Sequence, residues 1–351
     1  MWNDIRRCRV TIDDEGVIKI AVSGIPRGYH FPRPEGNWLQ EKHKEQIFAI
    51  SPHIELVEIP AHQVEGVEGI TVLLAEGGNR VHYPGELDWE DYQKFFTHSL
   101  EWVQLCSTGF SDNVTPAVLQ GAVTLTNAPG LHTIPIAECV LAAILDHVKH
   151  LRQRRIDQSK HEWNRLENDE LNERTVLILG LGRIGKKVAQ LCKAFGMRVV
   201  GVKRNLTEVA GVDAAVAVTE LHEHLPHADF VVLALPFTPE TESLLGENEF
   251  DVMKESAYLI NIGRGKVVDE AAMIRALNDS SIAGAYLDAF AEEPLPANHV
   301  LWDMDNVLLV PHDSHSSPHI GDRMVDLFCA NLQQYVRGKP LDNVCDPRKG
   351  Y

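Results

Sequence analysis

The sequence predicts an α/β protein of two domains. Three observations support this: the chain length, the alternation of apolar and polar segments, and a glycine-rich turn after one apolar segment. The chain has 351 residues, which at about 150 residues per domain gives two domains that can each bury a core. Hydrophobic residues make up 44% of the chain and charged residues 24%, as in ordinary globular proteins. We therefore do not expect disorder across the whole chain.

The charge balance and the cysteines exclude several classes of function. Acidic residues number 50 and basic residues 33, so the net charge is −17, and such a surface repels nucleic-acid phosphates. No apolar run approaches the ~20 residues that span a bilayer, and the first ten residues lack the apolar core of a secretory signal. The six cysteines include no Cys-x-x-Cys pair, which favours reduced thiols over disulfides or zinc. We expect a cytoplasmic protein that binds no nucleic acid, membrane or metal.

Short apolar runs separated by polar, helix-like stretches fill the first part of the chain. An N-terminal hairpin is expected first, with arms at residues 9–12 and 17–20 around a turn at 13–16. Three strands are then expected at residues 54–59, 70–74 and 102–106. This alternation indicates an α/β domain.

A long helix is expected at residues 134–151. Pro135 suits its first turn. Its apolar stripe is broad, so we expect burial on more than one side, as in a subunit contact. The next segment, residues 152–173, is polar and charged, with Trp163 standing out, and we expect a solvated arm.

The second part of the chain contains six continuous apolar runs, which are typical of strands covered on both faces of a parallel sheet. They lie at residues 176–179, 198–202, 230–235, 258–262, 283–287 and 307–310. Helical patterns separate most of them, for example at residues 186–195 and 271–278. Repeated strand–helix–strand units predict a doubly wound sheet.

A glycine-rich turn directly follows the first of these runs and opens a helix. Its sequence is Gly180-Leu181-Gly182-Arg183-Ile184-Gly185. Gly180 allows a tight turn, Gly182 lets backbone N–H groups approach a pyrophosphate, and Gly185 lets the helix pack close to the strand. The helix N-terminus adds partial positive charge. The motif in this context predicts a Rossmann-type dinucleotide-binding domain.

The residues after the second strand indicate which nucleotide is bound. An acid there would bind the adenosine ribose hydroxyls of NAD, but Lys203 and Arg204 stand in its place. Because these cations would pair with a 2′-phosphate, we expect NADP(H) to be preferred. The alternative is a solvated basic turn in an enzyme that uses NAD(H).

Three residues in the second part of the chain are candidates for catalysis. Arg264 and His312 each come just after an apolar run, where parallel sheets present ligands, and Glu293 precedes a proline. Glu292 is the alternative candidate to Glu293, and His315 is the alternative to His312.

These motifs together resemble the D-isomer-specific 2-hydroxyacid dehydrogenase family. The glycine turn, the segment 235–241, Arg264 and the segment 288–294 follow the family's order, over roughly residues 20–345. The 29-residue step from Arg264 to Glu293 also fits. The NADPH-linked 2-ketoacid reductases of the glyoxylate and hydroxypyruvate type are the most similar branch.

The resemblance implies reversible reduction of a small 2-oxoacid to the D-2-hydroxyacid. Arg264 would anchor the substrate carboxylate. His312 would donate a proton to the carbonyl oxygen and take it back in oxidation. Glu293 would pair with His312, orient its ring and raise its pKa.

The resemblance also implies contacts with cofactor and substrate. Besides Gly180, Gly182, Arg183, Ile184, Gly185, Lys203 and Arg204, the cofactor-binding residues would be Pro236, Thr241, Ile262, Gly263 and Asp288. Asp288 and the backbone of Ile262 and Gly263 would hold the nicotinamide amide. Ser107, Thr108 and Gly109 would receive the substrate carboxylate.

One departure from the family pattern lies directly after His312. The family usually has an aliphatic residue and then small residues, whereas this chain has Asp313-Ser314-His315-Ser316. We expect these polar groups beside the nicotinamide, where they can affect substrate choice.

The implied architecture is a discontinuous, flavodoxin-like substrate domain, residues 1–127 with a C-terminal helix in 316–351, and a nucleotide domain at 128–315. A homodimer through the helix at 134–151 is expected. The alternative function is a nucleotide-sensing, corepressor-like adaptor on the same fold. The presence of Arg264, Glu293 and His312 together favours an enzyme with turnover. A formate-type dehydrogenase would replace Glu293 with Gln.

Overall fold

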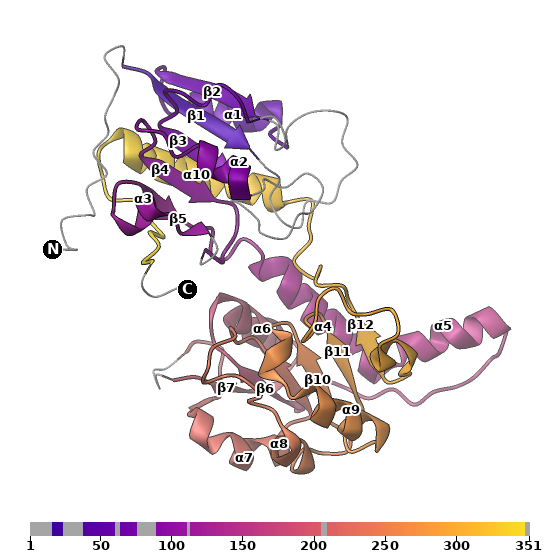
Figure 1. The fold of residues 1–351 in the computed structure, drawn as a ribbon. Helices are drawn as coiled ribbons and strands as arrows, with labels where there is room; N and C mark the ends of the chain where they lie inside the picture. The colour runs from indigo at the N-terminus through magenta and orange to yellow at the C-terminus, as the bar shows by residue number, and fades with distance from the viewer. Residues whose placement is uncertain are drawn as a thin grey trace. The chain divides into compact units, whose positions relative to one another are not determined.

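A computed structural model describes residues 16–23, 38–59, 64–75, 89–110, 113–204 and 209–347. The chain divides into two compact units. Unit 1 comprises the described residues within Met1–Leu131 and Ser316–Tyr351, and unit 2 is formed by His132–His315. Each unit contains a parallel sheet with helices on both faces (Figure 1).

Unit 1 contains a five-stranded sheet in the order β2-β1-β3-β4-β5, with every neighbouring pair parallel. Its strands are β1 (Ile18–Ser23), β2 (Ile54–Ile59), β3 (Val72–Ala75), β4 (Trp102–Leu105) and β5 (Thr124–Thr126). Its helices are α1 (Glu41–Phe48), α2 (Trp89–Lys94), α3 (Pro116–Leu119) and α10 (Ile320–Val336). The order 2-1-3-4-5 is that of flavodoxin-like folds, as predicted.

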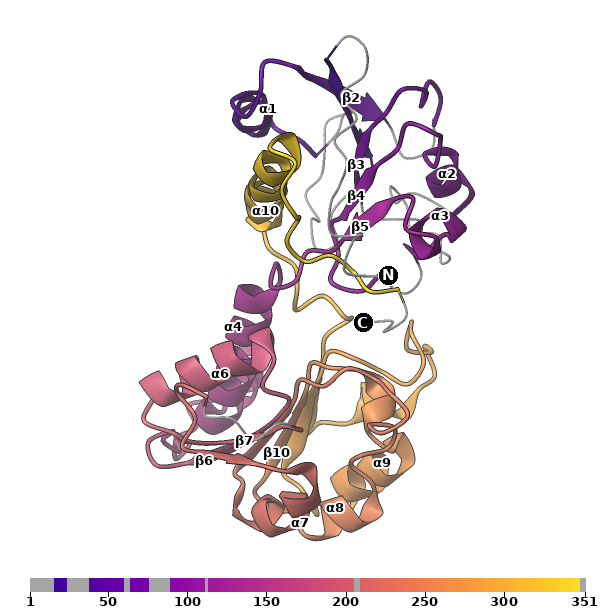
Figure 2. The same ribbon diagram turned by 90° about the vertical axis from the view of Figure 1, so that its left-hand side faces the viewer.

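The last helix of the chain completes the core of unit 1. Helices α1 and α10 cover one face of the sheet, and α2 and α3 cover the other (Figure 2). Trp102 on β4 stacks on Phe328 of α10 with ring centroids 5.2 Å apart. Both side chains are fully buried, so packing of the C-terminal helix depends on burial of large aromatic surfaces.

The predicted N-terminal hairpin is wrong in its second arm. Residues 18–20 belong to β1, which pairs in parallel with β2 on one side and β3 on the other. A hairpin partner would need a free edge along this strand, and both edges are used. The first arm, residues 9–12, lies outside the described residues.

Unit 2 contains a seven-stranded parallel sheet in the order β12-β11-β10-β9-β6-β7-β8. Its strands are β6 (Thr175–Leu179), β7 (Arg198–Val202), β8 (Ala214–Val216), β9 (Phe230–Leu233), β10 (Tyr258–Asn261), β11 (Gly284–Leu287) and β12 (Val307–Leu309). Counted from β6, six of these strands have the Rossmann order 3-2-1-4-5-6, and β12 adds one more. The predicted fold class is therefore confirmed.

Helices cover both faces of this sheet (Figure 2). One face packs against α4 (Thr133–Lys149) and α6 (Arg183–Ala194), and the other against α8 (Glu247–Asp251) and α9 (Glu270–Asn278), with α7 (Leu221–His224) beside them. The five inner strands are buried along nearly their whole length, which explains their continuous apolar runs.

The segment after α4 is more helical than predicted. Helix α4 ends at Lys149, the next residue His150 has a left-handed φ of +52°, and α5 (Leu151–Lys160) follows at once. Because α5 is polar on nearly all sides, its sequence carries no helical periodicity of apolar residues. Trp163, just beyond it, is 92% exposed. Among the described residues, no helix is long and apolar enough to cross a membrane.

Candidate active site in unit 2

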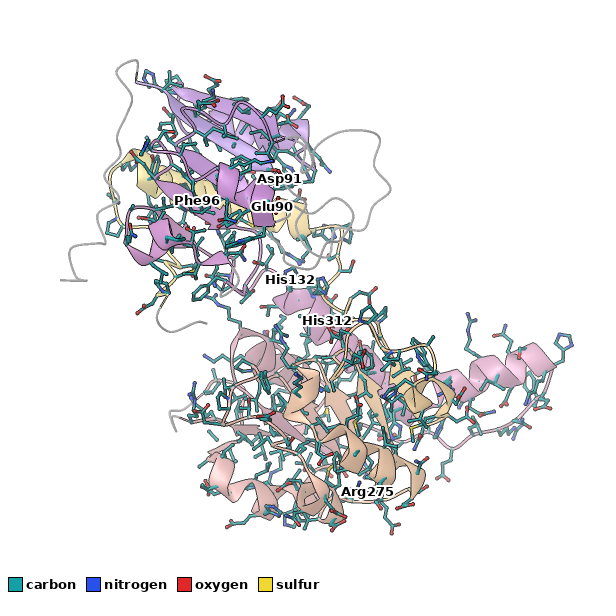
Figure 3. The ribbon with its side chains drawn as sticks, viewed as in Figure 1. Glu90, Asp91, Phe96, His132, Arg275 and His312 are labelled. Atoms are coloured by element: carbon teal, nitrogen blue, oxygen red, sulfur yellow. The ribbon has the colours of Figure 1, made fainter. Side chains whose placement is uncertain are left out.

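The predicted nucleotide and catalytic residues of unit 2 lie on the loops that follow its strands. Because all seven strands are parallel, these loops share the carboxyl-terminal edge of the sheet. The strand order reverses between β6 and β9, where such sheets bind nucleotides. His312 lies three residues after β12, at the opposite end of unit 2 from Arg275 on α9 (Figure 3).

The glycine turn after β6 has the geometry of a pyrophosphate cradle. Gly180 has a φ of +103°, and a Cβ there would lie 2.6 Å from the carbonyl oxygen of Ala234. A Cβ on Gly185 would lie 1.9 Å from the Gly180 carbonyl oxygen, so helix and strand approach each other closely. Gly182 is the N-cap of α6, and a Cβ there would meet nothing within 4 Å. The turn therefore leaves open space before the N–H groups of Arg183 and Ile184, which begin α6.

Lys203 and Arg204 directly follow β7, the neighbour of β6 in the sheet. The backbone N–H of Lys203 donates to the Val216 carbonyl at 3.1 Å, which continues the pairing with β8. Arg204 is exposed. A cationic pair thus lies at the carboxyl edge next to the glycine turn.

The turn after β9 is closed by the hydroxyl of Thr241. This hydroxyl accepts from the Thr238 N–H at 2.8 Å and donates to the Pro236 carbonyl at 2.8 Å. Pro236 and Thr241, which the family resemblance implies together, are therefore parts of one turn.

Arg264 is held by a turn that a buried asparagine organises. The side chain of Asn261, at the end of β10, accepts from the Gly263 N–H at 3.0 Å and donates to the Arg264 carbonyl at 3.2 Å. The Arg264 guanidinium donates one bond from Nη1 to the Gly263 carbonyl at 2.8 Å and is exposed. Sequence reasoning missed Asn261, although an amide at the end of an otherwise apolar run was a usable signal.

Ile262 and Gly263 bring this turn close to the loop after β9. Both residues are buried. A Cβ on Gly263 would lie 2.7 Å from the Leu235 carbonyl oxygen. The turn can therefore offer backbone groups but no side chain from residue 263.

Glu293 and His312 form a hydrogen-bonded pair. The imidazole Nδ1 of His312 donates to Oε2 of Glu293 at 2.8 Å, and Oε1 of Glu293 accepts from the Phe290 N–H at 3.0 Å. With Nδ1 used in this way, Nε2 is the nitrogen left for chemistry. His312 has a φ of +52°, a strained backbone conformation of a kind that clusters at functional sites.

The electrostatics of the pair favour an ionised Glu293. Burial alone would raise its pKa, but the hydrogen bonds from His312 and Phe290 and the charges of His312 and Arg264 outweigh burial. The pKa of Glu293 therefore lies below its ordinary value. The neighbouring acid Glu292 is exposed. His315, the rival histidine, has its ring centroid 6.1 Å from that of His312 and 5.2 Å from that of His132.

Asp288, at the end of β11, is buried and bound by Ser314. Both residues are 3% exposed. The Ser314 N–H donates to Asp288 Oδ1 at 3.1 Å, and the Ser314 hydroxyl donates to Oδ2. Burial raises the pKa of the Asp288 carboxyl, although the Ser314 hydrogen bonds oppose this shift.

The predicted substrate loop belongs to unit 1 and follows β4. The Ser107 hydroxyl donates to the Gly109 carbonyl at 2.8 Å. The Thr108 hydroxyl donates to the Ala128 carbonyl at 3.3 Å, and the Thr108 carbonyl accepts from the Asn127 amide at 2.6 Å. The loop is thus fixed by contacts within its own unit. No cluster of three or more metal-ligating side chains occurs in the described part of the chain.

Fold and site together define a class of protein. A Rossmann sheet with an open glycine turn binds a dinucleotide. A His–Glu pair can transfer a proton, and an exposed guanidinium can bind a carboxylate. This combination is that of a nicotinamide-dependent oxidoreductase acting on small acids.

Comparison with known proteins identifies the family. The family model for the NAD-binding domain of D-isomer-specific 2-hydroxyacid dehydrogenases matches residues 141–314. A glyoxylate reductase from Aeropyrum pernix is 35% identical over 259 residues, which are 70% of this chain and 76% of the relative. The chain belongs to the D-isomer-specific 2-hydroxyacid dehydrogenase family, and it is an NAD(P)-dependent enzyme of that class.

Solved structures of the family agree with the fold. A family protein from Aeromonas salmonicida has a TM-score of 0.76 and 28% identity, covering 94% of this chain and 99% of that one. A D-isomer-specific 2-hydroxyacid dehydrogenase from Xanthobacter autotrophicus, solved with NADPH and MES, has a TM-score of 0.73 and 26% identity, covering 95% and 99%. The agreement thus extends over both units.

Proposed function

We propose that the chain reduces a small 2-oxoacid to the D-2-hydroxyacid, with NADPH as the preferred cofactor. The observation that carries the proposal is the His312–Glu293 pair, within the field of Arg264, on loops at the same edge of the sheet as the glycine turn. The names of the relatives support glyoxylate as one substrate, since the Aeropyrum pernix protein is a glyoxylate reductase.

Arg264 anchors the substrate carboxylate in this proposal. Its guanidinium is exposed, and its backbone is fixed by Asn261. A planar guanidinium can form two parallel hydrogen bonds to a carboxylate, and its permanent positive charge opposes the repulsion from an acidic protein surface. The loop of Ser107, Thr108 and Gly109 is assigned to binding the same carboxylate.

His312 acts as general acid in reduction. The imidazolium gives its Nε2 proton to the substrate carbonyl oxygen, which becomes the new hydroxyl. In the reverse direction the neutral ring takes that proton. Glu293 orients the ring through Nδ1 and stabilises the imidazolium.

The cofactor is held by residues whose arrangement fits it. The glycine turn with Arg183 and Ile184 binds the pyrophosphate at the start of α6, and Pro236 and Thr241 form the neighbouring wall. Ile262, Gly263 and Asp288 hold the nicotinamide amide. When bound, the reduced cofactor supplies the hydride that the substrate's keto carbon accepts.

Lys203 and Arg204 carry the assignment of NADPH over NADH. Their position after β7 is where an acid would bind the ribose hydroxyls of NAD. The Xanthobacter autotrophicus structure contains NADPH, which supports this assignment.

A homodimer is also proposed. Ile134 in the first turn of α4 and Leu151 at the start of α5 are 39% and 46% exposed, and Trp163 beyond α5 is almost fully exposed. Apolar groups exposed along α4, α5 and the segment that follows them suit a contact with a second copy of the chain.

The experiment is a panel of glyoxylate, hydroxypyruvate and pyruvate against NADPH and NADH. We expect turnover with at least one 2-oxoacid and a higher kcat/KM with NADPH. Tight NADPH binding without oxidation by any 2-oxoacid would instead favour the nucleotide-sensing adaptor.

A further inference from the structure

Asp288 and Ser314 form a buried polar pair beside the catalytic histidine. Asp288 directly follows β11, and Ser314 lies two residues after His312. The two hydrogen bonds between them use both oxygens of the carboxylate, one from the Ser314 N–H and one from its hydroxyl. The Ser314 carbonyl in turn accepts from the Cys139 thiol of α4 at 3.7 Å. Ser314 is therefore fixed from two sides.

Because Asp288 and Ser314 are both buried, the carboxylate depends on the hydrogen bonds that Ser314 donates. A carboxylate removed from water needs hydrogen-bond donors. Ser314 supplies two donors, and a carboxylate has room for about four, so further donors can still be accepted. A two-point contact of this kind also fixes the rotation of the carboxylate about its Cβ–Cγ bond.

The same contact restrains the turn that carries His312. Before the turn, the Val310 N–H donates to the Leu287 carbonyl at 2.9 Å, next to Asp288. After the turn, Ser314 donates to Asp288 itself. The left-handed residue His312 is thus held between two attachments to the end of β11.

We propose that the Ser314 hydroxyl is a positioning group for the nicotinamide ring. It holds the Asp288 carboxylate in the orientation that accepts the N–H of the nicotinamide carboxamide, and it holds the His312 turn to the same strand end. This inference rests on the proposed function, in which Asp288 binds that amide.

The test compares NADPH with its 3-acetylpyridine analogue, which carries an acetyl group in place of the carboxamide and has no N–H to donate. The quantity measured is the ratio of the two kcat/KM values. Ser314→Ala should lower the preference for NADPH about fivefold to tenfold, the worth of one hydrogen bond. Asp288→Ala should lower it at least as much, and Ser314→Thr, which keeps the hydroxyl, should return it toward the wild-type ratio.

A charge control separates hydrogen bonding from electrostatics. Asp313→Asn removes a negative charge that acts on Asp288 without removing its hydrogen bonds, so the ratio should stay at its wild-type value. An equal fall in Asp313→Asn would overturn the inference. If Ser314→Ala does not fold, Ser314→Cys keeps the volume and weakens the donor, and the ratio must fall there too.

The possible outcomes separate the role of Ser314 from the proposed 2-oxoacid reductase function. If Ser314→Ala slows both cofactors equally, the serine is only structural and the inference is wrong, while the proposed function stands. If Asp288→Ala keeps the wild-type ratio in an active enzyme, the amide-binding role of Asp288 is wrong, and the role of Ser314 falls with it.

Discussion

Arg264 combines an exposed guanidinium with a backbone fixed by Asn261. Arg264→Ala should raise KM for the 2-oxoacid at least about 30-fold, because hydrogen bonds to charged groups contribute about 1.5–3 kcal/mol each. Steady-state kinetics measure this. The matched control is Arg275→Ala, since Arg275 is also exposed but lies at the other end of unit 2 (Figure 3). An unchanged KM in Arg264→Ala would remove Arg264 as the anchor.

His312 is the second residue whose role can be isolated. His312→Ala should lower kcat at least ~100-fold, the usual scale of general acid–base help. His315→Ala is the control, because the His315 ring is close to His312 but is not hydrogen-bonded to Glu293. If the two variants exchanged these effects, the acid would be His315.

The lowered pKa of Glu293 predicts a pH dependence of stability. A carboxyl whose folded pKa is depressed stabilises the native state above its unfolded pKa, and this contribution is lost as pH falls through the folded pKa. The window therefore lies below the ordinary Glu value of 4.5. As pH falls through that window, the melting temperature of wild type should fall more than that of Glu293→Gln. The control variant Glu292→Gln should behave as wild type. Parallel curves for wild type and Glu293→Gln would contradict the paired geometry.

At the scale of elements, the close approach of α6 and β6 depends on Gly185. Gly185→Ala places a Cβ 1.9 Å from the Gly180 carbonyl oxygen, so the helix must move. We expect a loss of about 1–3 kcal/mol in unfolding free energy and weaker NADPH binding, measured by denaturation and calorimetry. Gly246→Ala is the control, since its Cβ would have only ordinary contacts at 3.5 Å. Equal stability of both variants would show that the packing is looser than described.

In the proposed function, the turn after β7 determines the choice of cofactor. Replacing Lys203 and Arg204 together by alanine should raise KM for NADPH by about 10-fold or more, since charge-assisted contacts to phosphate are lost. KM for NADH should hardly change. An equal rise in KM for both cofactors would show that Lys203 and Arg204 do not bind the 2′-phosphate.

The elements that the sequence predicted well are those whose burial dictates their composition. The strands of unit 2 are covered on both faces, so their apolar runs located them to within about two residues, as the shortening of the predicted 230–235 to β9 shows. The strands β5 (Thr-Leu-Thr) and β8 (Ala-Ala-Val) were missed because neither forms a strongly apolar run, unlike the equally short β12 (Val-Leu-Leu). The polar helix α5 was missed for lack of an apolar face.

The site was predictable where motifs constrain chemistry and not where tertiary contacts do. Gly180, Glu293 and His312 have residue types and spacings that the chemistry demands. By contrast, the support that Ser314 gives to Asp288 depends on loops from different strands meeting at one edge. No local pattern in the sequence encodes such a meeting.

For the whole molecule, the proposed homodimer makes a direct prediction. Light scattering should give twice the 39.2 kDa mass of one chain. Leu151→Asp, which introduces a charge between α4 and α5, should shift the protein toward the monomer. Phe195→Asp is the control, because Phe195 is similarly exposed, at 43%, at the end of α6. A monomeric wild type would refute the dimer.

Chiral analysis of the product formed from hydroxypyruvate or pyruvate with NADPH is the sharpest test of the proposed reaction. Wild type should oxidise one NADPH for each 2-oxoacid consumed and release the D-2-hydroxyacid, whereas His312→Ala should form almost none in the same time. The proposed reaction is wrong if the product is the L-2-hydroxyacid. It is also wrong if a folded protein that binds NADPH oxidises none with any 2-oxoacid.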